Sequence, residues 1–155
     1  MSTRGEILVK IKDSDVGKKV KVNPSLLTDS ETSIERFNNK CFEIELSGKY
    51  GEIYCHHDSY PNGLGKALVT NFNDYDKALN LILGGDTSGV GDMSACYVAI
   101  VDDGEWYEDV KPDFYDEIPR MSEEYQYLFE DGQWFVRSIH GSISDFVSVS
   151  EYLKQ

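Results

Sequence analysis

The stretch from Tyr54 to Gly65, Tyr-Cys-His-His-Asp-Ser-Tyr-Pro-Asn-Gly-Leu-Gly, contains the side chains best suited to chemistry. It holds two of the three histidines, an aspartate and a serine, and it ends in a Gly-x-Gly sequence. An apolar run leads into it and a helical pattern follows it. Such a junction between a strand and a helix can present side chains and open backbone amides to a ligand. The same residues also suit a demanding turn, so both interpretations stay open.

A small anionic ligand is the first chemistry that this stretch suggests. Gly63 and Gly65 lie just before a predicted helix, where free amides and the helix dipole favour phosphate or carboxylate. Arg4 and Lys66 are the basic side chains best placed to assist. The resulting pocket for a nucleotide-like phosphorylated molecule would comprise Arg4, His56, Asp58, Tyr60, Gly63, Gly65 and Lys66. Against this, Pro61-Asn62-Gly63 is already a favourable turn sequence for structural reasons.

Catalysis and metal binding receive less support. Asp58 could orient His56 as a general base, with Ser59 or Cys55 as the nucleophile. Adjacent residues of a strand point to opposite faces, however, and no Gly-x-Ser-x-Gly elbow is present. His56 and Asp58 would share one face of an extended strand, but two ligands are too few for a zinc or iron site. We therefore predict no metal, no cofactor and no catalytic residue, and keep His56 and Asp58 as the catalytic alternative.

A strongly acidic segment competes with this stretch for the functional role. Residues 102–131 carry twelve Asp and Glu against Lys111 and Arg120, so they hold ten of the thirteen net negative charges. Such a field repels phosphate, which argues against direct binding of nucleic acid or an anionic membrane, and it attracts a basic protein. The residues predicted to bind that partner are Asp109, Asp113, Asp116, Glu117, Glu123 and Glu124. The alternative is a solvated face that maintains solubility.

Apolar periodicity and turn residues predict the elements that position these groups. Strands are expected at 6–12, 18–22, 94–101, 125–130 and 133–138, and a hairpin is expected between 41–46 and 51–57. Helices are expected after Gly65, at 75–83, at 144–154 and, in short form, at 33–37, whereas 111–123 is expected to be a loop. Asp131-Gly132 favours a type I′ turn. The predicted class is α+β: a mostly antiparallel sheet with about three helices packed on one side.

Length and composition predict a single domain over 1–155, with an insertion at 13–40 and the acidic loop region at 102–131. The three cysteines are widely spaced and odd in number, so we expect reduced thiols rather than a disulfide framework. No apolar run reaches the length of a membrane span, and the first residues lack a signal-peptide core. We therefore expect a cytoplasmic protein.

Two sequence motifs resemble those of a family of small uncharacterised proteins found in phages, other mobile elements and cellular genomes. The first is Ser2-Thr3-Arg4-Gly5, and the second is the core from His56 to Gly65, which has the form His-x-Asp-Ser-Tyr-Pro-x-Gly-x-Gly. The loop at 85–88 and the hairpin at 127–134 are similar to later parts of the same family. The resemblance implies an accessory role, such as non-enzymatic inhibition of a host defence protein in the host cytoplasm. The acidic segment would then act as a DNA-mimic-like surface toward a basic host protein, such as a nucleic-acid-binding defence enzyme.

Overall fold

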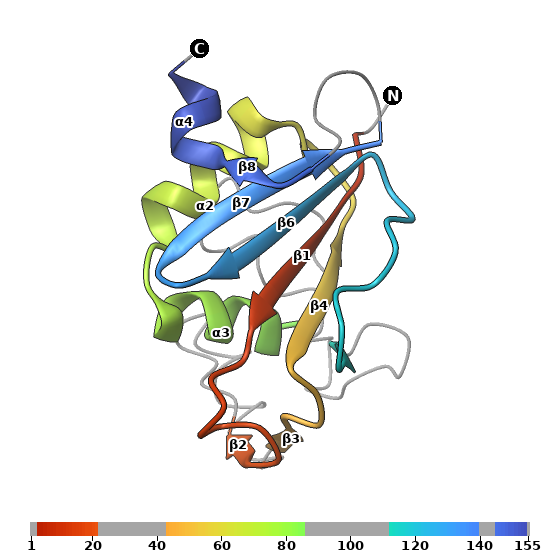
Figure 1. Cartoon of the computed structure of the whole chain (residues 1–155), viewed down its shortest axis with the longest axis vertical. Coiled ribbons are helices and arrows are strands. Elements are labelled where there is room, and N and C mark those ends of the chain that lie inside the picture. The colour runs from red at the N-terminus through yellow and green to blue at the C-terminus, as the bar shows by residue number, and fades with distance from the viewer. Residues whose placement is uncertain (1–2, 22–42, 86–111, 140–144, 155) are drawn as a thin grey trace, which may run out of the picture.

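The computed structural model describes residues 3–21, 43–85, 112–139 and 145–154 (Figure 1). The strand predicted at 94–101, the short helix predicted at 33–37 and the partner-binding residue Asp109 lie outside the described residues. None of the helices in the described ranges has the length and apolar character that crossing a membrane requires.

A six-stranded sheet forms the centre of the molecule, in the order β5-β4-β1-β6-β7-β8. Its strands are β1 (Gly5–Lys10), β4 (Tyr50–Cys55), β5 (Asp113–Tyr115), β6 (Tyr125–Glu130), β7 (Gln133–Ser138) and β8 (Val147–Ser148). β1 pairs with β6 in parallel, and every other pair in the sheet is antiparallel. A separate two-stranded sheet joins β2 (Lys19–Lys21) to β3 (Glu43–Glu45).

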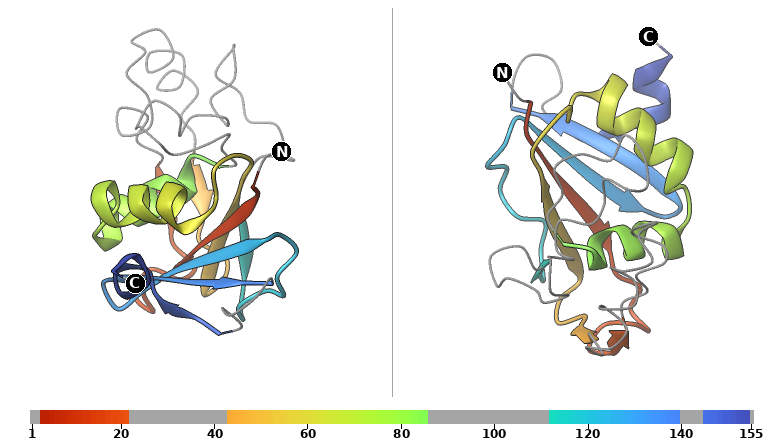
Figure 2. Two further views of the ribbon diagram at one scale, coloured as in Figure 1. Left: turned by 90° about the horizontal axis from the view of Figure 1, so that it is seen from above. Right: turned by 180° about the vertical axis from the view of Figure 1, so that it is seen from behind.

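The helices cover one face of this sheet, which we call the inner face (Figure 2). They are α2 (Lys66–Asn71), which continues the π-helical turn η2 (Pro61–Gly65), together with α3 (Tyr75–Leu83) and α4 (Val149–Leu153). Alternate strand residues point into the core on this face: Ile7, Val9, Ile53, Cys55, Tyr127, Phe129, Trp134 and Val136. Leu64, Leu68 and Phe72, predicted to share a helical stripe, are all buried against them. The predicted α+β class is confirmed.

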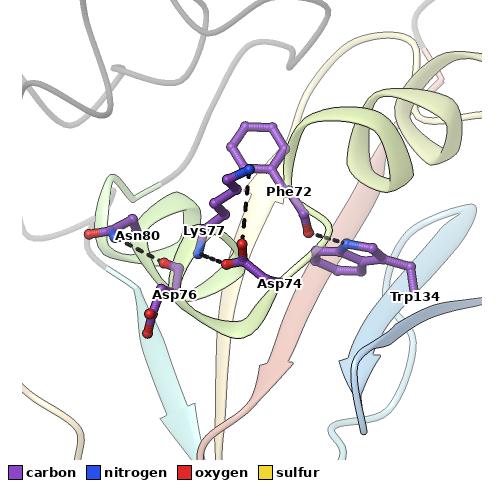
Figure 3. Close-up of polar contacts among 6 residues, drawn as sticks. All are labelled: Phe72, Asp74, Asp76, Lys77, Asn80 and Trp134. Carbon is purple, nitrogen blue, oxygen red and sulfur yellow. Dashed lines mark hydrogen bonds and ion pairs between the residues drawn. The ribbon is translucent and has the colours of Figure 1, made fainter.

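Local signals placed α3 and the last hairpin correctly. The Asp74 side chain caps α3 by accepting the Lys77 amide at 2.8 Å, and Asn80 donates to the Asp76 carbonyl at 2.9 Å (Figure 3). The Trp134 indole donates to the Phe72 carbonyl at 2.7 Å, which joins the end of α2 to β7 (Figure 3). In the turn between β6 and β7, Asp131 and Gly132 both have positive φ, 52° and 78°, as a type I′ turn requires.

Three predictions of local structure are wrong. β3 pairs with β2 rather than with β4, because β4 lies between β1 and β5 inside the large sheet. The expected loop at 111–123 contains β5, a strand held by pairing with β4 that its own sequence does not reveal. The last helix begins only after Ser148, because Val147 pairs with Val136 of β7 as part of a strand. The Ser148 hydroxyl accepts the Glu151 amide at 3.4 Å and caps the helix.

Candidate functional site

The stretch from His56 to Gly65, which we call the His-to-Gly turn, leaves the sheet earlier than expected. β4 ends at Cys55, and Asp58 adopts a left-handed backbone with φ of 56°. His56 and Asp58 therefore do not share a strand face, and the argument that placed them side by side does not hold. The Tyr54 hydroxyl instead forms a hydrogen bond of 2.8 Å with Nδ1 of His56, and the rings of His56 and His57 lie 4.4 Å apart.

Ser59 is the buried centre of the turn, with no exposed surface. Its amide donates to the Thr3 carbonyl at 3.1 Å, and its hydroxyl donates to the Cys55 carbonyl at 3.3 Å. Its own carbonyl accepts the Tyr127 hydroxyl at 2.6 Å. A buried, donating hydroxyl is poorly placed to attack a substrate. The Cys55 thiol is buried as well, and burial raises its pKa, which disfavours the reactive thiolate.

The glycines of the motif are required by close packing. A Cβ at Gly63 would lie 2.5 Å from the Asp58 carbonyl oxygen, closer than real contacts allow. A Cβ at Gly65 would lie 3.1 Å from Cγ1 of Val149 in α4 and 3.3 Å from the Tyr127 ring. These glycines therefore let the turn fold onto itself and onto β6 and α4.

The backbone amides expected to bind an anion donate within the turn instead. Leu64 donates to the Asp58 carbonyl at 2.8 Å, and Gly63 donates to the Tyr60 carbonyl at 2.9 Å. The Lys66 amide donates to the carbonyls of Gly63 and Pro61. An anion at this position would thus meet side chains rather than open amides.

Side chains on the surface of the turn remain available to solvent. Arg4, His57, Asp58 and Lys66 are exposed, and Tyr60 is 43% exposed. Pairing of Gly5 with Cys55, together with the hydrogen bond from Ser59 to Thr3, places the backbone of Arg4 beside the turn. Among the described residues, no group of three or more His, Cys, Asp or Glu side chains could hold a metal ion.

The described carboxylates predicted to bind a partner belong to β5 and to residues 116–124, which we call the acidic strap because they connect β5 to β6 (Figure 1). The strap is fixed by Glu6 of β1, whose side chain is almost fully buried at 4% exposure. Oε1 of Glu6 accepts the Ser122 amide at 2.9 Å and the Glu123 amide at 3.3 Å. Hydrogen bonds to a buried carboxylate are stronger than those between neutral groups.

Two further side chains hold the strap at Pro119. Its carbonyl accepts Nε2 of Gln126 at 3.0 Å and Nη2 of Arg137 at 3.4 Å, while Nε of Arg137 donates to Oε1 of Gln126 at 2.7 Å. Glu6, Gln126 and Arg137 are direct neighbours in register across β1, β6 and β7. They lie on the face opposite the helices, which we call the outer face. The sequence analysis missed all three, although each is a polar residue next to an apolar residue of its strand.

The carboxylates predicted to bind a partner are largely directed to solvent. Asp113, Asp116 and Glu117 are exposed, and Glu123 and Glu124 are half-buried. Tyr115 of β5 lies among them and is 37% exposed. Burial raises its pKa first, and the nearby charges of Glu52, Asp113 and Glu6 raise it further. Only the part of the rise that these carboxylates cause indicates a negative potential at this edge of the sheet.

A cleft of about 410 Å³ lies away from both features, at the end of β1 opposite the His-to-Gly turn. It is bounded by the end of β1, the start of α3 and the turn between β6 and β7. The sequence analysis expected a pocket at the His-to-Gly turn, whereas this cleft lies at the other end of β1. Comparison with protein-family models, with curated proteins and with solved structures finds no match to this chain.

Proposed function

We propose that this protein is a non-enzymatic binding protein that docks a basic protein through β5 and the acidic strap. The observation that carries this proposal is the anchoring of the strap by Glu6, Gln126 and Arg137. A strap bonded at both Pro119 and Ser122 presents its carboxylates in a fixed arrangement. Fixed charges lose less conformational entropy on binding than mobile ones do, which favours a specific complex.

The charge of this surface favours a partner that ordinarily binds nucleic acid. Between residues 112 and 131 there are seven Asp and Glu against Arg120 alone. One of the seven, Glu130, is paired with Lys10 at 2.8 Å. Spaced carboxylates can replace backbone phosphates toward a basic groove, and long-range attraction speeds the encounter. The resemblance to phage and mobile-element proteins adds the role: inhibition of a host defence enzyme.

The geometry of the His-to-Gly turn supports a non-enzymatic function. The Ser59 hydroxyl, the Cys55 thiol and the amides of Gly63 and Leu64 all form internal hydrogen bonds. Most of the residues that suggested chemistry are thus accounted for by the folding of the turn.

A second candidate function is binding or hydrolysis of a nucleotide-like phosphorylated molecule on the surface of the turn. It is favoured by the exposed Arg4 and Lys66, which lie near His56 and Asp58 in an otherwise acidic protein. This function predicts a rise in melting temperature with nucleotides that Arg4→Ala or His56→Ala abolishes. A nucleotide panel without any shift would remove it, and turnover lost in Asp58→Asn would establish hydrolysis.

The docking proposal is tested by reversing four charges while leaving the anchors intact. The test variant changes Asp113, Asp116, Glu117 and Glu124 to Lys. The matched control changes four exposed acidic residues elsewhere to Lys: Glu43, Glu45, Asp76 and Asp145. Partners recovered with the wild-type protein from its native host are identified by mass spectrometry, purified and titrated against each variant.

We expect the test variant to lose binding and the control to retain it, with both variants folded by circular dichroism. Binding should also weaken steeply with added salt, since exposed charges are screened. A purified partner that binds the folded test variant as tightly as the wild type would overturn the proposal.

A further inference from the structure

The 410 Å³ cleft at the end of β1 combines an apolar floor with a charged rim. Ile11 and Phe129 lie beneath the cleft and are 1% and 2% exposed, so the apolar surface open to a ligand is small. Tyr75 at the start of α3 supplies an aromatic wall. Lys10, Lys12, Asp13 and Asp131 form the rim. A concave apolar surface with a few polar groups is typical of a small-ligand site.

The ammonium group of Lys12 already lies over the Tyr75 ring. Nζ of Lys12 lies 4.4 Å from the centroid of the Tyr75 ring, a distance at which a cation is attracted to the ring face. Tyr75 is fixed in place, because its hydroxyl donates to Oδ2 of Asp15 at 2.9 Å and accepts the Lys12 amide at 3.1 Å. Lys12 itself is exposed, so its side chain can leave the ring without unfolding the cleft.

The surroundings of the cleft favour a cation over an anion. The charged groups at or next to it are Asp13, Asp15, Asp76, Glu130 and Asp131, and Lys10, Lys12 and Lys18. Lys10 is paired with Glu130 at 2.8 Å and Lys18 with Asp15 at 3.6 Å, which leaves Asp13, Asp76 and Asp131 against Lys12. Burial, Asp15 and Asp76 together raise the pKa of Tyr75 to about 12. Burial is the largest of these causes, and the two carboxylates add a negative potential at the ring.

We propose that this cleft binds an alkylammonium group, supplied either by a free polyamine or by a lysine side chain of a protein. The ammonium would lie between the Tyr75 ring and the carboxylates of Asp13 and Asp131, and the methylene chain would extend along the cleft. This arrangement matches the amphipathic character of an alkylammonium, with an apolar stem and a charged head. In the free protein, Lys12 takes the place of the ligand.

The full chain is titrated calorimetrically with spermidine and, separately, with Nα-acetyl-lysinamide, so that the two sources of the group are distinguished. The decisive variant is Lys12→Ala, which removes both a competitor for the ring and a repulsive charge. We expect it to bind the preferred probe about three- to fivefold more tightly, the scale of one exposed cation–π contact. If the cleft instead bound an anion, Lys12→Ala would weaken binding, because the site would lose a basic side chain.

Two further variants locate the site. Tyr75→Leu in the Lys12→Ala background should return the affinity to the wild-type value or below it, since it removes the ring. Asp131→Asn should weaken binding by up to about fivefold, because one exposed charge pair is lost, and asparagine tolerates the positive φ of this turn position. Asp116→Asn removes the same charge from the acidic strap and should leave the affinity nearly unchanged.

The proposal is overturned if neither probe binds Lys12→Ala at millimolar concentration, if Lys12→Ala binds more weakly than the wild type, or if Asp116→Asn weakens binding as much as Asp131→Asn. None of the cleft variants alters β5 or the anchors of the strap. Failure here would therefore leave the docking proposal standing, and loss of docking in the strap variant would leave the cleft intact.

Discussion

The His-to-Gly turn and the acidic strap satisfy their polar groups in opposite ways. In the turn, the Ser59 amide and hydroxyl donate to the carbonyls of Thr3 and Cys55, and the amides of Gly63 and Leu64 donate to carbonyls within the turn. The backbone of the strap instead forms hydrogen bonds with side chains of the strands. Most carboxylates of the strap remain at the surface. The residues best suited to chemistry thus form mostly internal hydrogen bonds. The segment expected to be an irregular loop contains a strand and holds most of its carboxylates at the surface.

The strongest test of the structural role of the turn is Gly63→Ala. The added methyl would lie 2.5 Å from the Asp58 carbonyl oxygen, so the turn must shift. We expect the free energy of unfolding to fall by about 3 kcal/mol, measured by urea denaturation. Gly17→Ala is the control, because φ is 87° there but nothing lies within 4 Å of the new Cβ. It should cost about 1 kcal/mol. Equal costs at both sites would contradict the packing argument.

Tyr127→Phe tests the hydrogen bond that joins the turn to β6. It leaves the buried Ser59 carbonyl without the 2.6 Å donor, which should lower the free energy of unfolding by about 2 kcal/mol. Burial also raises the pKa of Tyr127 far above its ordinary value. The neutral phenol therefore contributes its full stabilising free energy below about pH 10. This contribution is lost as the pH rises further, because the phenol ionises in the unfolded state but stays neutral in the folded state.

The phenylalanine variant lacks this alkaline loss. The stability difference between Tyr127→Phe and the wild type should consequently narrow above about pH 10, by at most about 1.4 kcal/mol per pH unit. Urea denaturation between neutral and alkaline pH measures it. A difference that stays constant or widens would show that the phenol is not held neutral by the fold.

In the strap, Glu6→Gln should lower the free energy of unfolding less than Gly63→Ala or Tyr127→Phe does. Its main effect should be local, on the amides that Glu6 binds. Glutamine keeps one acceptor oxygen but loses the charge that strengthens both bonds to the strap, a loss of about 1 kcal/mol. We expect faster hydrogen exchange at the amides of Ser122 and Glu123, with β6 and β7 unaffected. Glu6→Ala should accelerate both amides further. Unchanged protection in Glu6→Ala would mean that the strap is held by other contacts.

The smallest effect is expected from neutralising exposed strap residues. Asp116→Asn combined with Glu117→Gln should change the free energy of unfolding by less than about 0.5 kcal/mol, because exposed charges contribute little to stability. The same pair should reduce partner affinity and its salt dependence. A stability change comparable to that of Glu6→Gln would show that these carboxylates support the fold rather than a partner.

Elements whose signals lie within about a dozen residues were predicted well. Asp74, the apolar period and Gly84-Gly85 together define α3 from Tyr75 to Leu83, since the cap, the stripe and the stop are all local. Asp131-Gly132 defines the β6–β7 hairpin in the same way. At the candidate sites, the sequence suggested Arg4 as a neighbour of the turn, and strand pairing places its backbone there.

Pairing over long distances was decided only by the tertiary structure. β1 lies parallel to β6 at a separation of about 120 residues, and β5 becomes a strand only because β4 offers it an edge. Contacts between distant residues also bring Glu6 to the Ser122 amide and pack Gly65 of the turn against Tyr127 and Val149. Composition and local pattern determined which residues carry charge, cap helices and turn the chain. The tertiary structure decided which of those groups are buried and hydrogen-bonded and which stay exposed. Burial and hydrogen bonding depend on neighbours that are distant in sequence, because they are properties of contacts rather than of single residues.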